Sequence, residues 1–294
     1  MQIDVIIPTY ERVELTRRAV DSVRAQTYPG WRVIVSDDGS SSKTLAALQD
    51  MASSDDRVTV VTGPNLGPQA ARQRGYEHTS AELIATLDSD DVWDPRKLEL
   101  QLKALDGFDI ALCRHRWVRD GRQAKPVRAL AGSGPMQPYL TTHNMSTPLI
   151  RRAALDRSGG FLPIGMRSLR NAEGVEFYCR LGQTSTYVVV PEVLVDCTSH
   201  DAVRASDDQG RTREGAQNLA YVVQVHAEAL TNWPNDLAAL LSRTGGRHVS
   251  SGQIRVGMRY FARSLAVAPV RQRLAIARQY GPLVAKSIVR SLGK

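Results

Sequence analysis

Short apolar runs alternate with longer amphipathic stretches over the first 92 residues of the chain. The apolar runs end at turn-forming residues, which is typical of buried strands. Between them, apolar residues recur every three or four positions, as they do on one face of a helix. We therefore expect strands at 3–8, 31–36, 57–62 and 83–87, and helices at 11–26, 43–51 and 67–77. This alternation predicts right-handed βαβ units and a mostly parallel sheet with flanking helices.

The pattern becomes irregular after residue 92. We expect helices at 95–105, 152–157 and 173–182, strands at 108–118, 145–150 and 186–195, and an irregular region at 121–138 with a loop at 132–135. From about residue 210 the helical periodicity returns and continues to the end. The sequence therefore predicts one α/β domain over 1–209, with halves 1–92 and 93–209, and a helical extension over 210–294.

The composition is that of a globular protein in a reducing compartment. Of the 294 residues, 42% are hydrophobic and 23% are charged, which suits an ordinary buried core. Cys113, Cys179 and Cys197 are widely separated, and this argues against a disulfide framework or a zinc site. The N-terminus has the pattern of a strand rather than of a signal peptide, and no apolar run is long enough to cross a membrane. We therefore expect a cytoplasmic location.

The net charge of +8 is concentrated at the C-terminal end. Residues 243–294 contain 11 of the 38 Lys and Arg residues and none of the 30 Asp and Glu residues, which leaves the remainder at −3. This asymmetry favours an anionic partner, a membrane surface or a polyanion, unless the basic residues only form a solubilising face. An apolar face in 270–294 suits peripheral contact with the inner face of an anionic membrane, or packing on the protein itself or a second subunit. Few aromatic residues accompany the basic ones, so nucleic-acid binding is a remote alternative.

Acidic residues follow two of the expected strands. They are Asp37 and Asp38 after the second strand, and Asp88, Asp90 and Asp91 after the fourth. In a parallel sheet these strand ends meet at one edge, where ligands bind. Carboxylates gathered there repel one another unless a cation lies among them, and Mg²⁺ or Mn²⁺ often bridges such oxygens to a phosphate. The alternative is that each cluster is a polar turn that caps the next helix. The chain lacks G-x-G-x-x-G after its first strand and lacks a P-loop, which argues against those nucleotide sites.

Several pieces of the chain occur in an order and at spacings that match a known family. They are Val5-Ile6-Ile7-Pro8-Thr9-Tyr10, Ala25-Gln26-Thr27-Tyr28-Pro29, Val35-Ser36-Asp37-Asp38-Gly39-Ser40-Ser41, Ala71-Arg72-Gln73-Arg74-Gly75, Leu87-Asp88-Ser89-Asp90-Asp91-Val92-Trp93, Arg151-Arg152-Ala153-Ala154-Leu155 and Gly159-Gly160-Phe161. Together they resemble the inverting glycosyltransferases of family 2, over about residues 1–205. The resemblance implies a GT-A fold, which is Rossmann-like with a mostly parallel central sheet. It also implies that 1–92 binds the nucleotide and 93–209 binds the acceptor.

The resemblance implies a role for each matching residue. It assigns nucleotide-sugar binding to Pro8, Thr9, Tyr10, Asp37, Asp38, Arg72, Asp88 and Ser89. Thr9 and Asp38, helped by Asp37, would contact the base and ribose, and Arg72 would lie near the base or the phosphates. Asp90 would be the direct ligand of Mn²⁺ or Mg²⁺. Asp88 would contact the ribose or the metal, and His200 would lie close to the diphosphate as a further metal-site residue.

The segment that should carry the catalytic base departs from the family pattern. The resemblance places the base in a Glu-Asp pair at the start of a helix, but Gly174 follows Glu173 here. Either Glu173 or Glu176 is then the base, or catalysis is impaired, because a carboxylate displaced by about 1 Å can cost on the order of 10²-fold in rate. Glu173 could also only complement the helix dipole. The family's Asn after Tyr10 is likewise replaced, by Glu11.

The resemblance therefore implies metal-dependent, inverting transfer of a sugar from a nucleotide-diphosphate sugar to a hydroxyl acceptor. A UDP-sugar is the expected donor by family frequency, and a cell-envelope or lipid-linked glycan is the expected acceptor. A carboxylate would take the proton of the acceptor, and the metal ion would stabilise the departing diphosphate. The alternative, motivated by Gly174, is a catalytically impaired protein that binds a nucleotide-sugar without transferring it.

Overall fold

The computed structural model describes residues 1–119, 122–126, 132–135, 144–162, 169, 172–198 and 209–292. The chain divides into two compact units, which we describe separately. The first contains Met1–Met136, His143–Ser168 and Thr184–His200, and the second contains Gln137–Thr142, Leu169–Gln183 and Asp201–Lys294. The domain boundaries predicted at residues 92 and 209 stay predictions.

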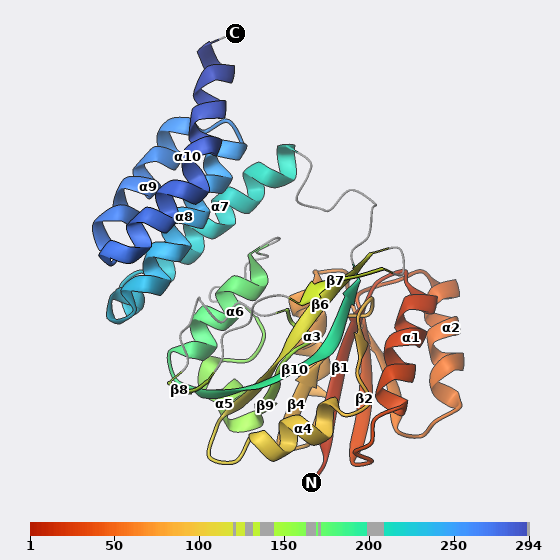
Figure 1. Ribbon diagram of the computed structural model, residues 1–294. Coiled ribbons are helices and arrows are strands. Elements are labelled where there is room, and N and C mark those ends of the chain that lie inside the picture. Colours follow the sequence, from red (N-terminus) through yellow and green to blue (C-terminus); the bar gives the residue numbers. More distant parts are fainter. Residues whose placement is uncertain are drawn as a thin grey trace. The chain divides into compact units, whose positions relative to one another are not determined.

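The described residues of the first unit form a mixed sheet of ten strands (Figure 1). The strands are β1 (Ile3–Thr9), β2 (Trp31–Asp37), β3 (Val58–Thr62), β4 (Leu83–Thr86), β5 (Val92–Trp93), β6 (Ile110–Arg119), β7 (Arg122–Pro126), β8 (Ser133–Pro135), β9 (Leu149–Arg151) and β10 (Thr186–Thr198). Their order is β3-β2-β1-β4-β9-β6-β10-β5, with β7 beside β6 and β8 beside β10. Strands β1 to β4 are parallel, as their apolar runs predict, and antiparallel pairs enter with β9 and β5.

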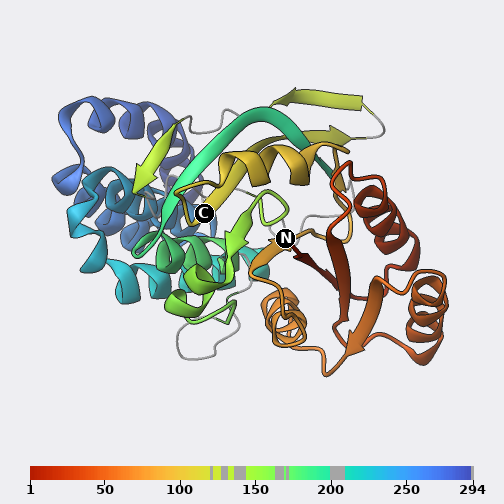
Figure 2. The same cartoon turned by 90° about the horizontal axis from the view of Figure 1, so that it is seen from below.

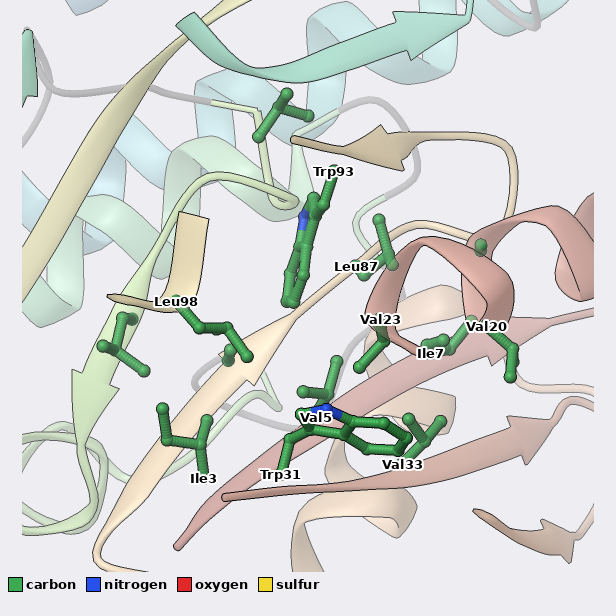
Figure 3. Packing of buried hydrophobic residues seen from close by; sticks show 14 of the residues in the cluster. Ile3, Val5, Ile7, Val20, Val23, Trp31, Val33, Leu87, Trp93 and Leu98 are labelled. Carbon is green, nitrogen blue, oxygen red and sulfur yellow. The ribbon is translucent and has the colours of Figure 1, made fainter. Parts of the chain in front are cut away.

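Helices cover both faces of this sheet, with α1 and α4 on one face and α3 on the other (Figure 2). The helices of the first unit are α1 (Val13–Arg24), α2 (Ser42–Ser53), α3 (Pro68–Glu77), α4 (Lys97–Ala104) and α5 (Arg152–Ser158). Successive side chains of a strand point to opposite faces. On one face of β1, Ile3, Val5 and Ile7 pack in a cluster with Val20 and Val23 of α1, all fully buried (Figure 3). Such burial contributes about 1.5–3 kcal/mol for each side chain.

The opposite face of β1 accepts α3 at very close range. A Cβ atom added at Gly75 of α3 would lie only 2.5 Å from Cγ2 of Ile6. Only glycine therefore allows α3 to approach the strand this closely. This contact accounts in physical terms for the glycine of the Ala71–Gly75 piece. The start of α3 lies near the carboxyl end of β1, since Pro68 lines the same pocket as Thr9.

The described part of the second unit is helical. Its elements are α6 (Glu173–Gly182), α7 (Gln209–His226), a short 3₁₀ helix (Ala229–Asn232), α8 (Pro234–Ser250), α9 (Ile254–Val267) and α10 (Val270–Leu292). Leucine and valine residues of α7 and α8 pack with Val175 and Cys179 of α6 in one buried cluster. Helix α6 belongs to this unit because of that cluster, although β10 of the first unit follows it in the sequence.

The structure confirms most of the elements predicted from the sequence, but not those between residues 121 and 150. Residues 132–135, predicted to be a loop, contain β8, which pairs with Thr186–Val188 of β10. Strand β7 lies in the region predicted to be irregular. Of the strand predicted at 145–150 only the end is correct, because Thr147 donates its N–H to Asn144 in a turn and β9 starts at Leu149.

One further difference between prediction and structure is the length of a strand. Strand β10 continues past Val195 to Thr198, with register shifts between Val190 and Val195 around Pro191. A proline has no N–H for the ladder, so the irregular register is the expected response. In the described part of the chain, no helix is both long enough and apolar enough to span a bilayer.

Candidate functional site

The carboxyl ends of β1, β2 and β4 meet at one edge of the sheet. Strand β1 is parallel to both neighbours, with Thr9 opposite Asp37 and Ile6 opposite Thr86. The residues that follow these strands therefore lie close together, as the two acidic clusters predict. This edge is where open α/β sheets bind ligands.

A pocket of about 330 Å³ lies at this edge. It is lined by Pro8, Thr9, Tyr10, Arg12, Asp38, Pro68, Ala71, Arg72, Asp88, Ser89 and Asp90. Every described residue that the sequence assigned to nucleotide-sugar binding is in this set except Asp37. The lining combines three carboxylates with two guanidinium groups, which suits a polar ligand that carries negative charge on one part.

Asp37 lies behind the pocket rather than in its wall. Its side chain is fully buried and accepts hydrogen bonds from the N–H of Ser40, at 3.1 Å, and the hydroxyl of Thr62, at 2.7 Å. These contacts hold the turn after β2. The structure therefore gives Asp37 a supporting position, where the sequence predicted that it helps to contact the base and ribose.

Asp38 lies in the pocket wall and is held by the loop that precedes α3. Its carboxylate accepts the N–H groups of Leu66, at 3.0 Å, and Gly67, at 2.8 Å. Gly67 has a φ of 97°, which allows the chain to turn there and present its N–H. Burial raises the pKa of Asp38, and the two backbone hydrogen bonds oppose that rise.

Arg72 and Asp88 form an ion pair in the pocket wall. Arg72 also donates to Oε1 of Gln69 at 2.5 Å, and its side chain is only 6% exposed. The Nε of Arg72 is buried, and no described residue accepts a hydrogen bond from it. Buried donors are normally satisfied, so this N–H marks a place for an acceptor on a ligand. A phosphate or ribose oxygen has the right chemistry.

Asp90 pairs with Arg12, a residue that no pattern in the sequence indicated. Nη1 of Arg12 lies 3.0 Å from Oδ2 of Asp90. Glu11, the residue before Arg12, has a φ of 52° and is the one non-glycine residue with positive φ in the described ranges. The signal available from sequence was the replacement of the family's Asn by Glu11, since Asn tolerates this backbone conformation better than Glu.

Asp91 supports the acidic segment from behind. It is 3% exposed and accepts hydrogen bonds from the hydroxyl of Ser146, at 2.6 Å, and the N–H of Thr198, at 3.0 Å. Burial, together with the nearby carboxylates of Asp88 and Asp90, raises the pKa of Asp91 to about 8. Asp91 does not line the pocket.

The donor set fits a divalent cation that is shared with a ligand. No group of three or more His, Cys, Asp and Glu side chains within the described ranges is arranged to hold a metal. Asp88 and Asp90 nevertheless present carboxylates to one pocket, and Mg²⁺ is commonly bound by one or two carboxylates plus substrate phosphates. His200, the third predicted metal-site residue, lies outside the described residues.

The two glutamates predicted as alternative bases have different environments. Both are in the second unit, at the first turn of α6. Glu173 is partly exposed, whereas Glu176 is fully buried and accepts hydrogen bonds from Nε and Nη2 of Arg180, at 3.0 and 3.1 Å. Nε2 of His226 lies 3.3 Å from the same carboxylate.

These contacts decide the character of Glu176. Burial alone would raise the pKa of Glu176, but the hydrogen bonds from His226 and Arg180 outweigh it and hold the pKa below its usual value. A buried carboxylate with its oxygens engaged does not suit a base that must reach an acceptor. The structure therefore argues against Glu176 as the base.

The chain is similar in sequence to known glycosyltransferases. The family model described as glycosyl transferase family 2 matches residues 4–170. An uncharacterized glycosyltransferase of Rickettsia bellii is 33% identical over 142 residues, which are 47% of this chain and 20% of the relative. The Escherichia coli protein named UDP-Glc:alpha-D-GlcNAc-diphosphoundecaprenol beta-1,3-glucosyltransferase WfgD is 34% identical over 104 residues, 35% of this chain and 40% of the relative. The aligned region thus spans less than half the length of these relatives.

Solved structures share the fold. Residues 1–349 of S. aureus TarS in complex with UDP-GlcNAc superimpose with a TM-score of 0.59 and 18% identity, covering 96% of this chain and 92% of that one. The mannosyltransferase PcManGT from Pyrobaculum calidifontis, in complex with GDP-Man and Mn²⁺, gives a TM-score of 0.60 and 16% identity, covering 99% and 86%. At such identities the likeness concerns the fold alone.

Proposed function

Because the chain belongs to glycosyl transferase family 2 and has the GT-A fold that its sequence predicts, we propose that it is a metal-dependent, inverting glycosyltransferase. It moves a sugar from a nucleotide-diphosphate sugar to a hydroxyl group. The observation that carries this proposal is the pocket at the carboxyl edge of the sheet. There Asp38, Asp88, Asp90 and Arg72 line one space of nucleotide-binding chemistry.

Different residues of the pocket bind different parts of the donor. Thr9 and Asp38, at the ends of β1 and β2, contact the base and ribose. Arg72 supplies its buried N–H to a ribose or phosphate oxygen. A UDP-sugar is the proposed donor, supported by the names of WfgD and of the TarS complex, although the PcManGT complex contains GDP-Man.

Asp90 is the proposed direct ligand of Mn²⁺ or Mg²⁺, and Asp88 and His200 complete the protein's share of the site. A bound divalent cation supplies Lewis-acid stabilisation of the departing nucleoside diphosphate. The carboxylates of the pocket would therefore hold the cation at the place where the leaving group gains negative charge. Asp91 keeps the Asp88–Asp90 segment in place through Ser146 and Thr198.

Glu173 is the proposed base that takes the proton from the acceptor hydroxyl. Its partial exposure suits this role, whereas the burial of Glu176 does not. The hydroxyl oxygen attacks the anomeric carbon in line with the leaving diphosphate, which inverts that centre. Gly174 leaves a second candidate, in which the protein binds the nucleotide-sugar but transfers sugar poorly or not at all.

The proposed acceptor is a cell-envelope or lipid-linked glycan, reached at the inner face of a membrane. The relative WfgD is named for a diphosphoundecaprenol substrate. TuaG of Bacillus subtilis, which is 37% identical to this chain over 102 residues, is named for teichuronic acid biosynthesis, and both names support this class of acceptor. Helices α9 and α10 both pack on α8 and leave between them an apolar groove of about 340 Å³. The groove is bordered by exposed Met258 and Leu265, and Leu274 is exposed on α10.

The charge of these helices supports an anionic lipid surface as the occupant. Helical spacing places arginines beside the apolar face of each helix. They are Arg255 and Arg259 on α9, and Arg271 and Arg278 on α10. No acidic residue occurs after residue 242 to repel a phosphate headgroup. Two copies of this face would repel each other by the same argument, which disfavours a homodimer through it.

Replacing Asp90 tests the catalytic proposal. We expect Asp90→Ala to abolish sugar transfer and to leave thermal unfolding of the ligand-free protein close to that of the wild type, because Asp90 is at the surface of the pocket. Full activity of the variant would refute the metal-dependent mechanism. The donor is identified by thermal unfolding with UDP, GDP, CDP or dTDP, each with and without Mn²⁺. A ligand at about 100 times its dissociation constant stabilises a fold by roughly 2.7 kcal/mol.

Gly174→Asp separates the two candidate functions. If transfer appears only in this variant, the wild type is a binding protein with an impaired catalytic centre. If the wild type turns over strongly, the impaired alternative is excluded. The same nucleotide should stabilise both proteins, because Gly174 does not line the nucleotide pocket.

A further inference from the structure

Arg12 occupies the position beside Asp90 where a metal ion is expected. The guanidinium lies 3.0 Å from the carboxylate, and Arg12 lines the same pocket. The Arg12 side chain is 47% exposed and that of Asp90 is 21% exposed. Ion pairs this open to water contribute little to stability and are easily replaced. The pair is therefore one that a competing cation could separate.

The backbone before Arg12 is held in an unfavourable conformation that delivers this side chain to Asp90. Glu11 has a φ of 52°, which non-glycine residues avoid. Its carboxylate accepts hydrogen bonds from the N–H of Ser41 and the hydroxyl of Thr44, and its own N–H donates to Ser40 at 2.8 Å. Strain that surrounding contacts maintain is typical of functional sites. Here the strained backbone at Glu11 fixes the turn between β1 and α1. This turn places the Arg12 side chain at the pocket.

Arg72, in the same pocket, is an arginine whose ion pair is fixed. It is 6% exposed and is held by both Gln69 and Asp88. Arg12 differs from it in being about half exposed. Of the two arginines, Arg12 is therefore the one whose guanidinium can move to a new anion without leaving a cavity.

We propose that Arg12 is an exchangeable counter-ion. It pairs with Asp90 in the ligand-free protein and moves to the diphosphate of the nucleotide when a divalent cation takes Asp90. This inference rests on the proposed function and adds a binding residue and an order of events to it. The cation must displace Arg12, and the diphosphate gives Arg12 a new partner.

The exchange makes metal and nucleotide binding depend on each other. Without nucleotide, Arg12 competes with the cation for Asp90 and weakens its binding. With nucleotide present, Arg12 no longer competes and instead strengthens binding of the diphosphate through a charge-assisted hydrogen bond. Because coupling is reciprocal, the nucleotide raises the affinity for the cation by the same factor by which the cation raises the affinity for the nucleotide.

Three variants test the exchange by binding alone. Free Mn²⁺ is measured by electron paramagnetic resonance for the wild type, Arg12→Gln, Arg12→Lys and the control Arg17→Gln, with and without UDP, GDP, CDP or dTDP. Arg17 is a matched control because it pairs with Glu14 on the surface of α1. Without nucleotide, we expect Arg12→Gln to bind Mn²⁺ about two- to fivefold more tightly than the wild type.

The nucleotide measurements complete the cycle. With Mn²⁺ present, Arg12→Gln should bind the nucleoside diphosphate about tenfold more weakly. Because the coupling factor is the ratio of the nucleotide affinities with and without Mn²⁺, it should fall by up to about the same factor. Arg12→Lys should keep most of the wild-type coupling, since it keeps the charge, and Arg17→Gln should match the wild type. Thermal unfolding of each variant confirms that it is folded.

Two results would overturn the role of Arg12 while leaving the proposed function intact. One is Mn²⁺ affinity that is unchanged or weaker in Arg12→Gln without nucleotide. The other is a coupling factor equal to that of the wild type. Failure of all four nucleotides to bind the wild type, with or without Mn²⁺, would instead overturn the proposed function and this inference together.

Discussion

Asp91 is the carboxylate of the acidic segment that burial perturbs most. Its pKa of about 8 in the folded protein lies well above the usual value of 3.8, so the folded state binds a proton more tightly than the unfolded state. This contribution to stability is complete below about pH 4 and is lost as the pH rises through 8. In metal-free buffer the free energy of unfolding should therefore fall with rising pH, by at most about 1.4 kcal/mol per unit.

Urea unfolding between about pH 5 and about pH 8 with a chelator measures this slope. Asp91→Asn removes the titrating group and should flatten the pH dependence, even if loss of a hydrogen bond to Ser146 or Thr198 lowers stability at every pH. Equal slopes in the wild type and Asp91→Asn would show that another group is responsible.

The acidic residues of the pocket and Arg72 could be predicted from sequence, but Arg12 could not. Asp38, Asp88 and Asp90 follow apolar runs, so the ends of parallel strands place them at one edge. Arg12 reaches Asp90 across 78 positions of sequence, and no local pattern encodes such a pair. Glu11 in place of Asn was a visible departure, but its meaning depends on a backbone angle that composition does not reveal.

At the scale of elements, the two glutamates at the start of α6 should separate catalysis from stability. Glu173→Ala should abolish transfer and lower the free energy of unfolding less than Glu176→Ala does, because Glu173 is partly exposed and Glu176 is fully buried. Glu176→Ala should cost about 3–5 kcal/mol, because it leaves Arg180 buried without its carboxylate. Denaturant unfolding and a transfer assay on both variants measure the contrast.

Glu173→Gln is the matched conservative variant, since it keeps the side-chain shape and removes only the basic oxygen. Transfer at the wild-type rate in Glu173→Gln would place the base elsewhere. A Glu176→Ala protein as stable as the wild type would mean that Arg180 finds solvent or another partner. The i, i+4 spacing of Glu176 and Arg180 was visible in the sequence, whereas the approach of His226, 50 positions away, was not.

Elements set by local pattern were predicted well, and elements set by pairing were not. Helix α6 runs over the predicted residues because its apolar spacing determines it. Strand β8 contains Gly134 at a φ of 137° and resembles a loop in sequence, but hydrogen bonds to β10 make it a strand. Its structure therefore depends on Thr186–Val188, 51 to 55 positions later, which no local pattern in Ser133–Pro135 contains.

For the molecule as a whole, we expect the proposed membrane contact to be electrostatic and apolar together. The full chain should sediment with vesicles that contain anionic lipid, more weakly with neutral vesicles, and less as salt increases. Leu274→Glu should weaken binding at least about fivefold, since it places a charge among the exposed apolar residues and repels the headgroups. Leu274 is 63% exposed, so the substitution should not disturb folding.

Leu66→Glu provides the control, because Leu66 is a leucine of nearly the same exposure, 62%, in the first unit. It should bind vesicles like the wild type. If deletion of residues 270–294 leaves vesicle binding unchanged, or if Leu274→Glu changes only the oligomeric state, the membrane contact is refuted. The concentration of basic residues in 243–294 was readable from sequence, but the groove between α9 and α10 depends on how both helices pack on α8.

The internal pairing of the acidic segment has a consequence for how the protein is supplied in a cell. Arg12 pairs with Asp90, and Arg72 pairs with Asp88. Asp91 accepts hydrogen bonds from Ser146 and Thr198. The described fold therefore provides partners for these three carboxyl groups without a metal ion. Proteins whose metal is part of the fold unfold when chelated. This chain should instead be synthesised, folded and stored before any manganese or magnesium reaches it, so scarcity of the ion would silence the protein without causing its loss.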